Sequence, residues 1–245
     1  MQLVRIKLLS DFRSLKKGFE MKFSDITIAD QYVSPICIVG KNGTGKSNWM
    51  ELLCEIFYYL DSLLLEYPAE SLLAKKEFGF EIEYKFNLTW NDAFEKWNEA
   101  NFTWSESIRH VKIVKKIDGS EPEYFLIDNN RNQIKLQKTG DTKRELKTKQ
   151  KLVLPNKIVG YSSGMNELIS SPFLKMQFHY FHEYKSRLQD DVLDSFEDGK
   201  LFYMNYESNA AIVVANYLLQ HPDKLSVLEN TVEIAELDSF RIVIE

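Results

Sequence analysis

The alternation of apolar and polar residues along the chain predicts several short strands. The clearest run is 78–88, where aromatic and aliphatic residues alternate with Gly, Glu, Lys and Asn. Such a strand has one buried and one solvated face, as in an antiparallel sheet. Weaker alternation over 1–9 and 19–23, separated by a polar break at 10–14, predicts a hairpin at the start of the chain. Further strands are expected at 110–117, 124–127, 133–136, 157–161, 201–204 and 240–244. Asp118-Gly119 is expected to form a hairpin turn. A loop or short helical insertion is expected at 90–104.

Helical spacing replaces this alternation over 46–66, where apolar residues recur on one face. Pro68 is expected to end this helix, because the residue before a proline disfavours the α region. Helical sequence is also expected over 166–189, interrupted near Pro172, and over 209–219.

A glycine-rich loop lies directly before the long helix. It follows the apolar run 36–39, which predicts a buried strand. The loop reads Gly40-Lys41-Asn42-Gly43-Thr44-Gly45-Lys46-Ser47 and fits the P-loop pattern G-x-x-x-x-G-K-[ST]. Glycines let the backbone approach an anion closely, and the amides at a helix N-terminus attract negative charge. We therefore expect Lys46 to reach the β- and γ-phosphates of a nucleotide and the Ser47 hydroxyl to bind Mg²⁺. The alternative is a glycine-rich turn that only caps the helix.

Composition and charge are those of an ordinary soluble globular protein. The 245 residues are 44% hydrophobic and 27% charged, and the net charge of −5 provides no overall basic field for nucleic acid. No window approaches the roughly 18 apolar residues of a membrane-spanning helix, and the N-terminus lacks the pattern of a signal peptide. We expect a cytoplasmic protein without membrane contact. Cys37 and Cys54 are expected to be buried thiols in a reducing compartment.

One lysine-rich segment, 137–156, departs from this balance of charge. Its only acidic residues are Asp141 and Glu145. Its basic residues are Lys138, Lys143, Arg144, Lys147, Lys149 and Lys151. The favoured interpretation is a solvated, mobile loop. The alternative is that the basic cluster at 138–151 contacts the phosphate backbone of DNA or RNA.

The start of the chain combines a strand at 3–7, the turn Asp11-Phe12-Arg13-Ser14-Leu15, a strand at 19–23 and a loop through Asn48 of the form Gly-x-Asn-Gly-x-Gly-Lys-Ser-Asn. In this combination it resembles the ABC-type ATPases related to RecF and the SMC proteins. Further stretches carry a narrower resemblance: Phe57-Tyr58-Tyr59-Leu60 with Leu65-Glu66-Tyr67, Gly160-Tyr161-Ser162-Ser163-Gly164 with Asn166-Glu167, Phe173-Leu174-Lys175-Met176, and Ser239-Phe240-Arg241-Ile242. They are similar to the restriction-system-associated AAA-family ATPases, bacterial proteins whose gene neighbourhood suggests defence against foreign DNA.

This resemblance implies a fold, cofactors and a set of contacts. It implies an α/β fold of mixed α+β character, with an ABC-ATPase-like N-terminal lobe over 1–160 that holds an antiparallel β subdomain and the P-loop unit. A mostly helical segment with terminal strands follows over 161–245. The implied cofactors are ATP and Mg²⁺, with Ser47 as a metal ligand. Contacts with the nucleotide are implied for Gly40, Asn42, Gly43, Thr44, Gly45, Lys46, Ser47, Asn48 and Arg13. Gln177 lies in the region of a glutamine that touches the metal; the alternative for both Arg13 and Gln177 is a surface position.

Two parts of an ABC-type site are not found in the sequence. Such ATPases hydrolyse ATP between two protomers: one supplies the P-loop and a Walker B strand ending in Asp-Glu, and the other a Leu-Ser-Gly-Gly signature. Tyr161-Ser162-Ser163-Gly164 lacks the second glycine of the signature, and Asn205 stands where Walker B requires an aspartate. We therefore expect the N-terminal part of a longer ATPase, or half of a split protein, which in isolation binds nucleotide weakly and hydrolyses it negligibly.

Three functions are weighed. The leading hypothesis is the ATP-binding lobe of an ABC-type ATPase in a bacterial anti-phage or restriction-associated system. In it, ATP closes a homodimer or joins a partner ATPase lobe, and a nuclease or other effector then acts on nucleic acid. The runner-up is a nucleotide-sensing interaction module without hydrolysis. A small-molecule kinase is disfavoured because lid arginines are not evident. A zinc site at His179 and His182 is disfavoured because no cysteine or third histidine is nearby.

Overall fold

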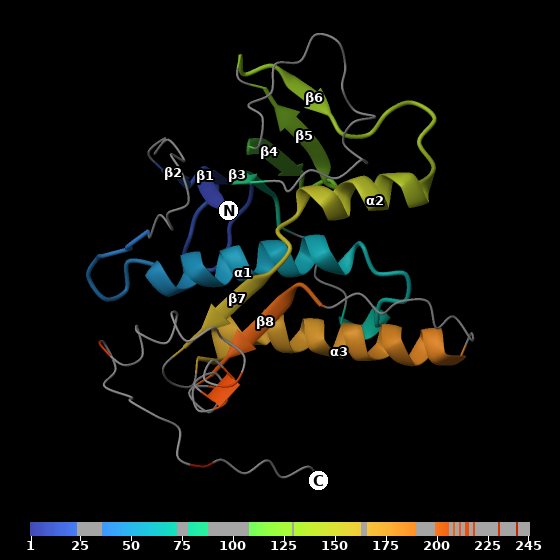
Figure 1. Ribbon diagram of the computed structural model, residues 1–245. Helices are drawn as coiled ribbons and strands as arrows, with labels where there is room; N and C mark the ends of the chain where they lie inside the picture. The colour runs from blue at the N-terminus through green and yellow to red at the C-terminus, as the bar shows by residue number, and fades with distance from the viewer. Residues whose placement is uncertain are drawn as a thin grey trace.

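The computed structural model describes residues 1–23, 36–72, 78–87, 108–128, 130–162, 166–189 and 199–205, and the single positions 208, 211, 214, 215, 218, 230 and 239. Within them the chain is a mixed α/β protein with an antiparallel sheet, a small parallel sheet and helices (Figure 1). The strands are β1 (Gln2–Leu8), β2 (Glu20–Lys22), β3 (Phe80–Asn87), β4 (Ile108–Lys115), β5 (Glu123–Ile127), β6 (Gln133–Lys135), β7 (Ile158–Tyr161) and β8 (Leu201–Met204). The helices are α1 (Lys46–Ser62), the short 3₁₀-helix η1 (Glu70–Leu72), α2 (Lys143–Val153) and α3 (Glu167–Gln189).

The larger sheet has six strands in the order β2-β1-β3-β4-β5-β6, and all its pairings are antiparallel. Its two faces follow the alternation in the sequence, because successive side chains of a strand point to opposite sides. In β3, Phe80, Ile82 and Tyr84 are fully buried, whereas Glu81 and Glu83 lie on the other face. The strands predicted at 1–9, 19–23, 78–88, 110–117, 124–127 and 133–136 are confirmed.

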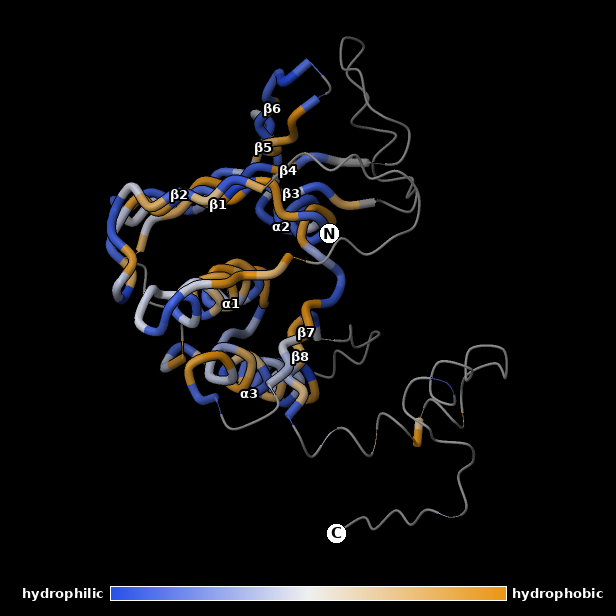
Figure 2. The backbone as a smooth tube through the Cα atoms, turned by 90° about the vertical axis from the view of Figure 1, so that its left-hand side faces the viewer, coloured by the Kyte–Doolittle hydropathy of each residue, from blue (hydrophilic) through white to orange (hydrophobic). Residues whose placement is uncertain are grey.

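The elements form three layers with α1 in the middle (Figures 1 and 2). Figure 2 shows the antiparallel sheet on one side of α1 and α3 on the opposite side. Leu52, Ile56 and Leu60 of α1 belong to the main core beneath the sheet. Tyr58 instead joins a second cluster with residues of α3 and β8, which are Ile169, Phe173, Met176 and Leu201. Burying one large apolar side chain stabilises a fold by about 1.5–3 kcal/mol, so α1 is fixed from both sides.

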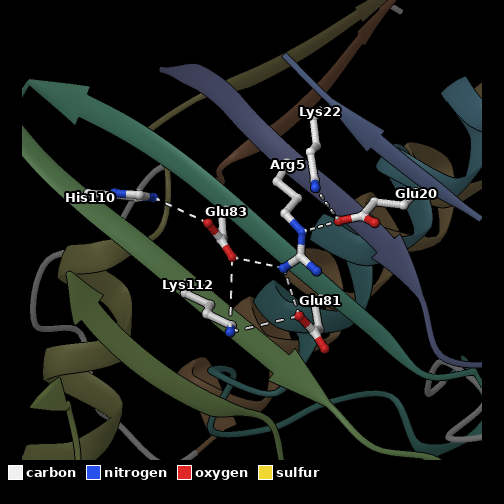
Figure 3. Close-up of polar contacts among 7 residues, drawn as sticks. All are labelled: Arg5, Glu20, Lys22, Glu81, Glu83, His110 and Lys112. Carbon is white, nitrogen blue, oxygen red and sulfur yellow. Dashed lines mark hydrogen bonds and ion pairs between the residues drawn. The ribbon is translucent and has the colours of Figure 1, made fainter. Parts of the chain in front are cut away.

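A network of ion pairs covers part of the outer face of the antiparallel sheet (Figure 3). Arg5 of β1 contacts Glu20 of β2 at 2.5 Å, and Glu81 and Glu83 of β3 at 2.9 and 3.0 Å. Lys112 of β4 lies 3.8 Å from Glu81, which extends the network to a fourth strand. The Arg5 side chain is only 20% exposed, so these pairs are better shielded from solvent than ordinary surface pairs. The network therefore ties neighbouring strands together on the face away from α1.

The smaller sheet consists of β7 and β8, which pair in parallel and are connected by α3. Gly160 of β7 faces Phe173 of α3 so closely that an added Cβ would lie 2.7 Å from its ring. The strands predicted at 157–161 and 201–204 are thus confirmed. The domain boundary predicted at 160 falls inside β7, whose partner strand β8 belongs to the second predicted domain.

The apolar run 36–39 is not a strand, which corrects the sequence prediction. Val39 is 85% exposed, and Cys37, expected to be buried, is exposed as well. A buried strand needs a neighbouring strand to complete its hydrogen bonds. In the described part of the chain, β7 and β8 pair only with each other, and this run pairs with neither. Cys54 of α1 is partly buried, and burial raises the pKa of its thiol to about 12.

The basic segment 137–156 contains α2 and is not the mobile loop that its lysines predicted. Thr142 begins the helix with a capping box: its side chain accepts a hydrogen bond from the Glu145 amide, and the Glu145 carboxylate accepts one from the Thr142 amide. Thr-x-x-Glu is a helix-start signal, and lysine is a good helix former. The high density of charge favours a loop, but the capping box and the helix propensity of lysine favour the helix that is found.

Helix α3 runs through Pro172 without the predicted interruption. A proline inside a helix lacks the amide hydrogen that would bond four residues back. Burial of its neighbours Phe173 and Met176 against α1 and β8 offsets this loss. Helix α1 ends at Ser62, before the predicted 66.

The predictions for 90–104, for most of 209–219 and for 240–244 lie outside the described residues. No helix in the described ranges is both long and apolar enough to cross a bilayer.

Candidate phosphate-binding site

The glycine-rich loop leads directly into the N-terminus of α1. Gly43 and Gly45 have left-handed φ angles of 82° and 91°, which only glycine adopts without strain. Gly45 is also the residue that caps α1, and it provides no side-chain hydrogen bond to the first turn. The first turn contains no acidic residue. The amides at this end of α1 and the positive end of its dipole are therefore free of the internal carboxylates that often occupy such a position.

Lys46 folds back over the loop that precedes it. Its Nζ atom donates hydrogen bonds to the carbonyl oxygens of Gly40 and Lys41, at 2.6 and 2.7 Å. The Thr44 hydroxyl donates to the same Lys41 carbonyl at 2.8 Å. The ammonium group is therefore placed at the loop by neutral carbonyls, with no carboxylate among these contacts, and its charge is available to an anion.

The residues that would face a bound metal and nucleotide lie at the surface. Asn42 and Ser47 are exposed, and the Ser47 hydroxyl is in the first turn of α1. The described residues contain no group of three or more His, Cys, Asp or Glu side chains that could hold a metal ion. A single hydroxyl fits Mg²⁺ only if phosphate oxygens and waters complete its shell, which is the usual arrangement for this ion.

The turn at 12–15 packs against the start of α1, although it lies far from the loop in the sequence. The Asn48 side chain donates a hydrogen bond to the Ser14 hydroxyl at 2.6 Å. The absent Cβ of Gly45 would lie 3.1 Å from a methyl group of Leu15. The structure thus brings the turn and the loop together. The contact found for Asn48, however, is with the turn.

Arg13 contacts a carboxylate of the protein. Its Nε and Nη2 atoms lie 3.2 and 2.6 Å from Glu51 Oε1, and the residue has a left-handed φ of 53°. The hydrogen bonds and then the charge of Glu51 raise the pKa of Arg13. Sequence reasoning missed Glu51. The only signal was its position four residues after Ser47, which places both on one face of the helix.

Among the described residues, no hydrogen bond or ion pair joins Gln177, Tyr161 or Asn205 to the glycine-rich loop. Gln177 is exposed on α3 and makes no hydrogen bond to the loop within the described ranges. Tyr161 ends β7 with its side chain exposed. Asn205 follows β8, and its Oδ1 atom accepts hydrogen bonds from the amide and hydroxyl of Ser208 at 3.1 and 3.0 Å. Asn205 therefore stabilises its own turn.

Part of the basic cluster on α2 is used inside the protein. Lys149 binds Asp141 at 2.7 Å with both side chains largely shielded, and Lys147 donates to the Leu65 carbonyl at 2.8 Å. Lys143 and Arg144 are exposed in the first turn of α2. A nucleic-acid contact here would depend mainly on these two residues.

His179 and His182 do not share a site. His179 is fully buried, and its Nδ1 accepts a hydrogen bond from the Ala69 amide at 3.0 Å. His182 is exposed and lies 3.2 Å from the Tyr67 carbonyl. Each ring thus contacts backbone groups of the segment after α1.

Comparisons with models of protein families, with curated proteins and with solved structures give no match. The resemblance to ABC-type ATPases is therefore a prediction from motifs. The described residues define a glycine-rich loop at a helix N-terminus, with the ammonium group of Lys46 bound to carbonyl oxygens of that loop.

Proposed function

We propose that this chain binds the phosphates of ATP with Mg²⁺ at residues 40–47, as the nucleotide-binding lobe of an ABC-type ATPase. The observation that carries the proposal is the conformation of the loop. Two left-handed glycines lead into an α1 N-terminus without a side-chain cap, and the Lys46 ammonium is held at the loop by carbonyl oxygens. Anions bind at such helix ends because amide hydrogens and the helix dipole act together.

In this proposal each loop residue has a defined role. Gly43 and Gly45 let the backbone turn so that amides face the phosphates. Lys46 leaves the carbonyls of Gly40 and Lys41 and pairs with a phosphate, and Ser47 provides its hydroxyl to Mg²⁺. The ion would polarise the phosphate oxygens and offset their charge.

Titration of the full chain with a fluorescent ATP analogue and Mg²⁺ tests the proposal. We expect saturable binding that Lys46→Ala weakens at least about tenfold, because a charge-assisted contact to phosphate is lost. Lys41→Ala is the matched control: it removes the same charge from the same loop and should change affinity less than about threefold. Equal effects of the two substitutions, or no binding, would contradict the proposal.

A second candidate function, nucleotide sensing without hydrolysis, is favoured by Asn205. An amide that caps its own turn carries no charge with which to hold the metal's water shell. For the isolated chain we expect bound nucleotide to be released unchanged, with negligible phosphate release in a turnover assay. Robust turnover would favour a complete ATPase site.

The wider assignment is part of the same proposal. ATP would close a homodimer or join a partner ATPase lobe, and a nuclease or other effector of a bacterial defence system would act on nucleic acid. Its support is the motif resemblance together with the exposed Lys143 and Arg144. Replacing both with Ala should reduce the salt dependence of DNA binding by about two counterions. Lys149→Ala is the comparison. If the slope of DNA affinity against salt concentration is unchanged when Lys143 and Arg144 are replaced, α2 is not part of the proposed DNA contact.

A further inference from the structure

The carboxylate of Glu51 lies next to the phosphate-binding loop and is nearly inaccessible to solvent. Its side chain is 4% exposed. Glu51 is one helical turn beyond Ser47, a spacing at which Cβ atoms are about 5–6 Å apart. An uncompensated carboxylate at this position would repel the phosphates that the loop is proposed to bind.

Arg13 provides the compensation through two contacts with one oxygen of Glu51, while Glu51 Oε2 is buried without a hydrogen-bond partner. A buried carboxylate that loses its cation is destabilising, because its charge is then neither solvated nor paired. Arg13 therefore cannot leave Glu51 without consequence, even though the arginine side chain itself is 53% exposed.

A second acid follows on the same face and adds to the negative charge. Glu55 lies one turn beyond Glu51, and its partner is Lys175 of α3 at 3.8 Å. Burial raises the pKa of Glu55 against the charge of Lys175, and the negative charge of Glu51 raises it further. Each of the two acids thus has a cation from a different element, Arg13 from the turn at 12–15 and Lys175 from α3.

We propose that Arg13 promotes nucleotide binding by neutralising Glu51 behind the loop, and that Arg13 and Glu51 act as one positioning pair. Arg13 thus acts on nucleotide binding through Glu51 and not through direct contact with the nucleotide. The pair also fixes the turn at 12–15 against α1, in addition to the hydrogen bond between Asn48 and Ser14. This inference rests on the proposed function, since it concerns the affinity of the same phosphate site.

The test is a double-mutant cycle on the full chain, read by titration with the fluorescent ATP analogue and Mg²⁺. Arg13→Ala should weaken binding about tenfold, because charges about 10 Å apart at an effective dielectric constant of about 20 change an equilibrium by that factor. Glu51→Gln should bind as the unaltered chain does or more tightly. The double variant should return to within about twofold of the unaltered chain, because its net charge at this position is the same.

Two controls separate this effect from general charge loss and from misfolding. Lys16→Ala removes a positive charge three residues after Arg13. Lys16 forms an exposed ion pair with Asp11, so this substitution should leave affinity within about twofold. Thermal unfolding of each variant should show a lower midpoint for Arg13→Ala, restored in the double variant.

The outcomes distinguish this inference from the proposed function. If Arg13→Ala has no effect, or if the double variant binds as weakly as Arg13→Ala, the inference is overturned while binding that depends on Lys46 still supports the phosphate site. If the unaltered chain binds no nucleotide, the proposed function fails and the inference fails with it.

Discussion

Gly43 and Gly45 have the same left-handed backbone but different surroundings. An added Cβ at Gly43 would meet nothing within 4 Å, whereas at Gly45 it would lie 3.1 Å from Leu15 and 3.4 Å from Ser14. Left-handed φ costs a residue with a Cβ about 1–2 kcal/mol, so both positions are strained by substitution. Only at Gly45 does the substitution also push the turn away from α1.

Gly45→Ala should therefore destabilise the chain more than Gly43→Ala does. We expect about 1 kcal/mol for Gly43→Ala and a further loss of about 1 kcal/mol for Gly45→Ala, since overpacking of a tight contact adds to the strain. Chemical denaturation of the two variants and the unaltered chain measures the difference. Equal free energies of unfolding would show that the contact between the turn and the loop is not maintained in solution.

At the residue scale, the sequence predicts a phosphate-binding role for the loop residues but does not reveal the internal partners of the residues around them. A motif such as the P-loop can be recognised because its residues are contiguous and each has a chemical reason. The partner of Arg13 could not be recognised in this way, because Glu51 is 38 positions away. The same holds for Asn48, whose partner Ser14 is 34 positions away.

At the scale of elements, the strands of the antiparallel sheet were predictable and two other segments were not. Alternation identifies a strand when one face is buried, as for β3, because the pattern reflects burial directly. The run 36–39 is apolar throughout, which cannot distinguish a buried strand from an exposed extended segment. Helix α2 was missed because its charge suggested a loop, although its capping box is a local signal.

Helix α2 provides a test at this scale. Thr142→Ala removes the capping side chain and should destabilise the chain by about 1 kcal/mol. Thr148→Ala is the matched control on the exposed surface of the same helix, where alanine has the higher helix propensity and the change should be neutral or slightly stabilising. Hydrogen exchange of the α2 amides in both variants gives the measurement. Unprotected amides in the unaltered chain would instead support the loop predicted from the lysines.

At the scale of the whole molecule, α1 connects the glycine-rich loop to both other layers. Its N-terminus carries the loop, one side packs under the antiparallel sheet, and the other contacts α3 (Figure 2). The contacts with α3 include several polar ones: Lys175 with Glu55, His179 with Tyr58, and Tyr180 with Asp61. The helix that carries the loop is therefore held against α3 by polar as well as apolar contacts.

His179 is the titratable centre of this contact. Its Nδ1 accepts from the Ala69 amide, so the neutral ring carries its hydrogen on Nε2, which lies 3.1 Å from the Tyr58 hydroxyl. The Tyr58 hydroxyl in turn donates to the Leu72 carbonyl. Protonation of Nδ1 would place its hydrogen against that of the Ala69 amide and break this hydrogen bond. Burial lowers the pKa of His179 from its ordinary 6.5.

The sign of the pH dependence follows from this lowered pKa. Below about pH 6.5, His179 binds a proton in the unfolded chain but stays neutral in the folded chain. The contribution of His179 to the free energy of unfolding is therefore fully present above that pH and decreases as the pH falls toward the folded pKa. We expect a loss on the order of 1 kcal/mol between pH 7.5 and 5.5, measured by chemical denaturation. His179→Gln should flatten this dependence, because glutamine has no titrating group at the contact. His182→Gln is the matched control on the same helix, because it leaves the contacts of His179 with Ala69 and Tyr58 in place. If both variants keep the slope of the unaltered chain, the contact between α1 and α3 is not the acid-sensitive part of the molecule.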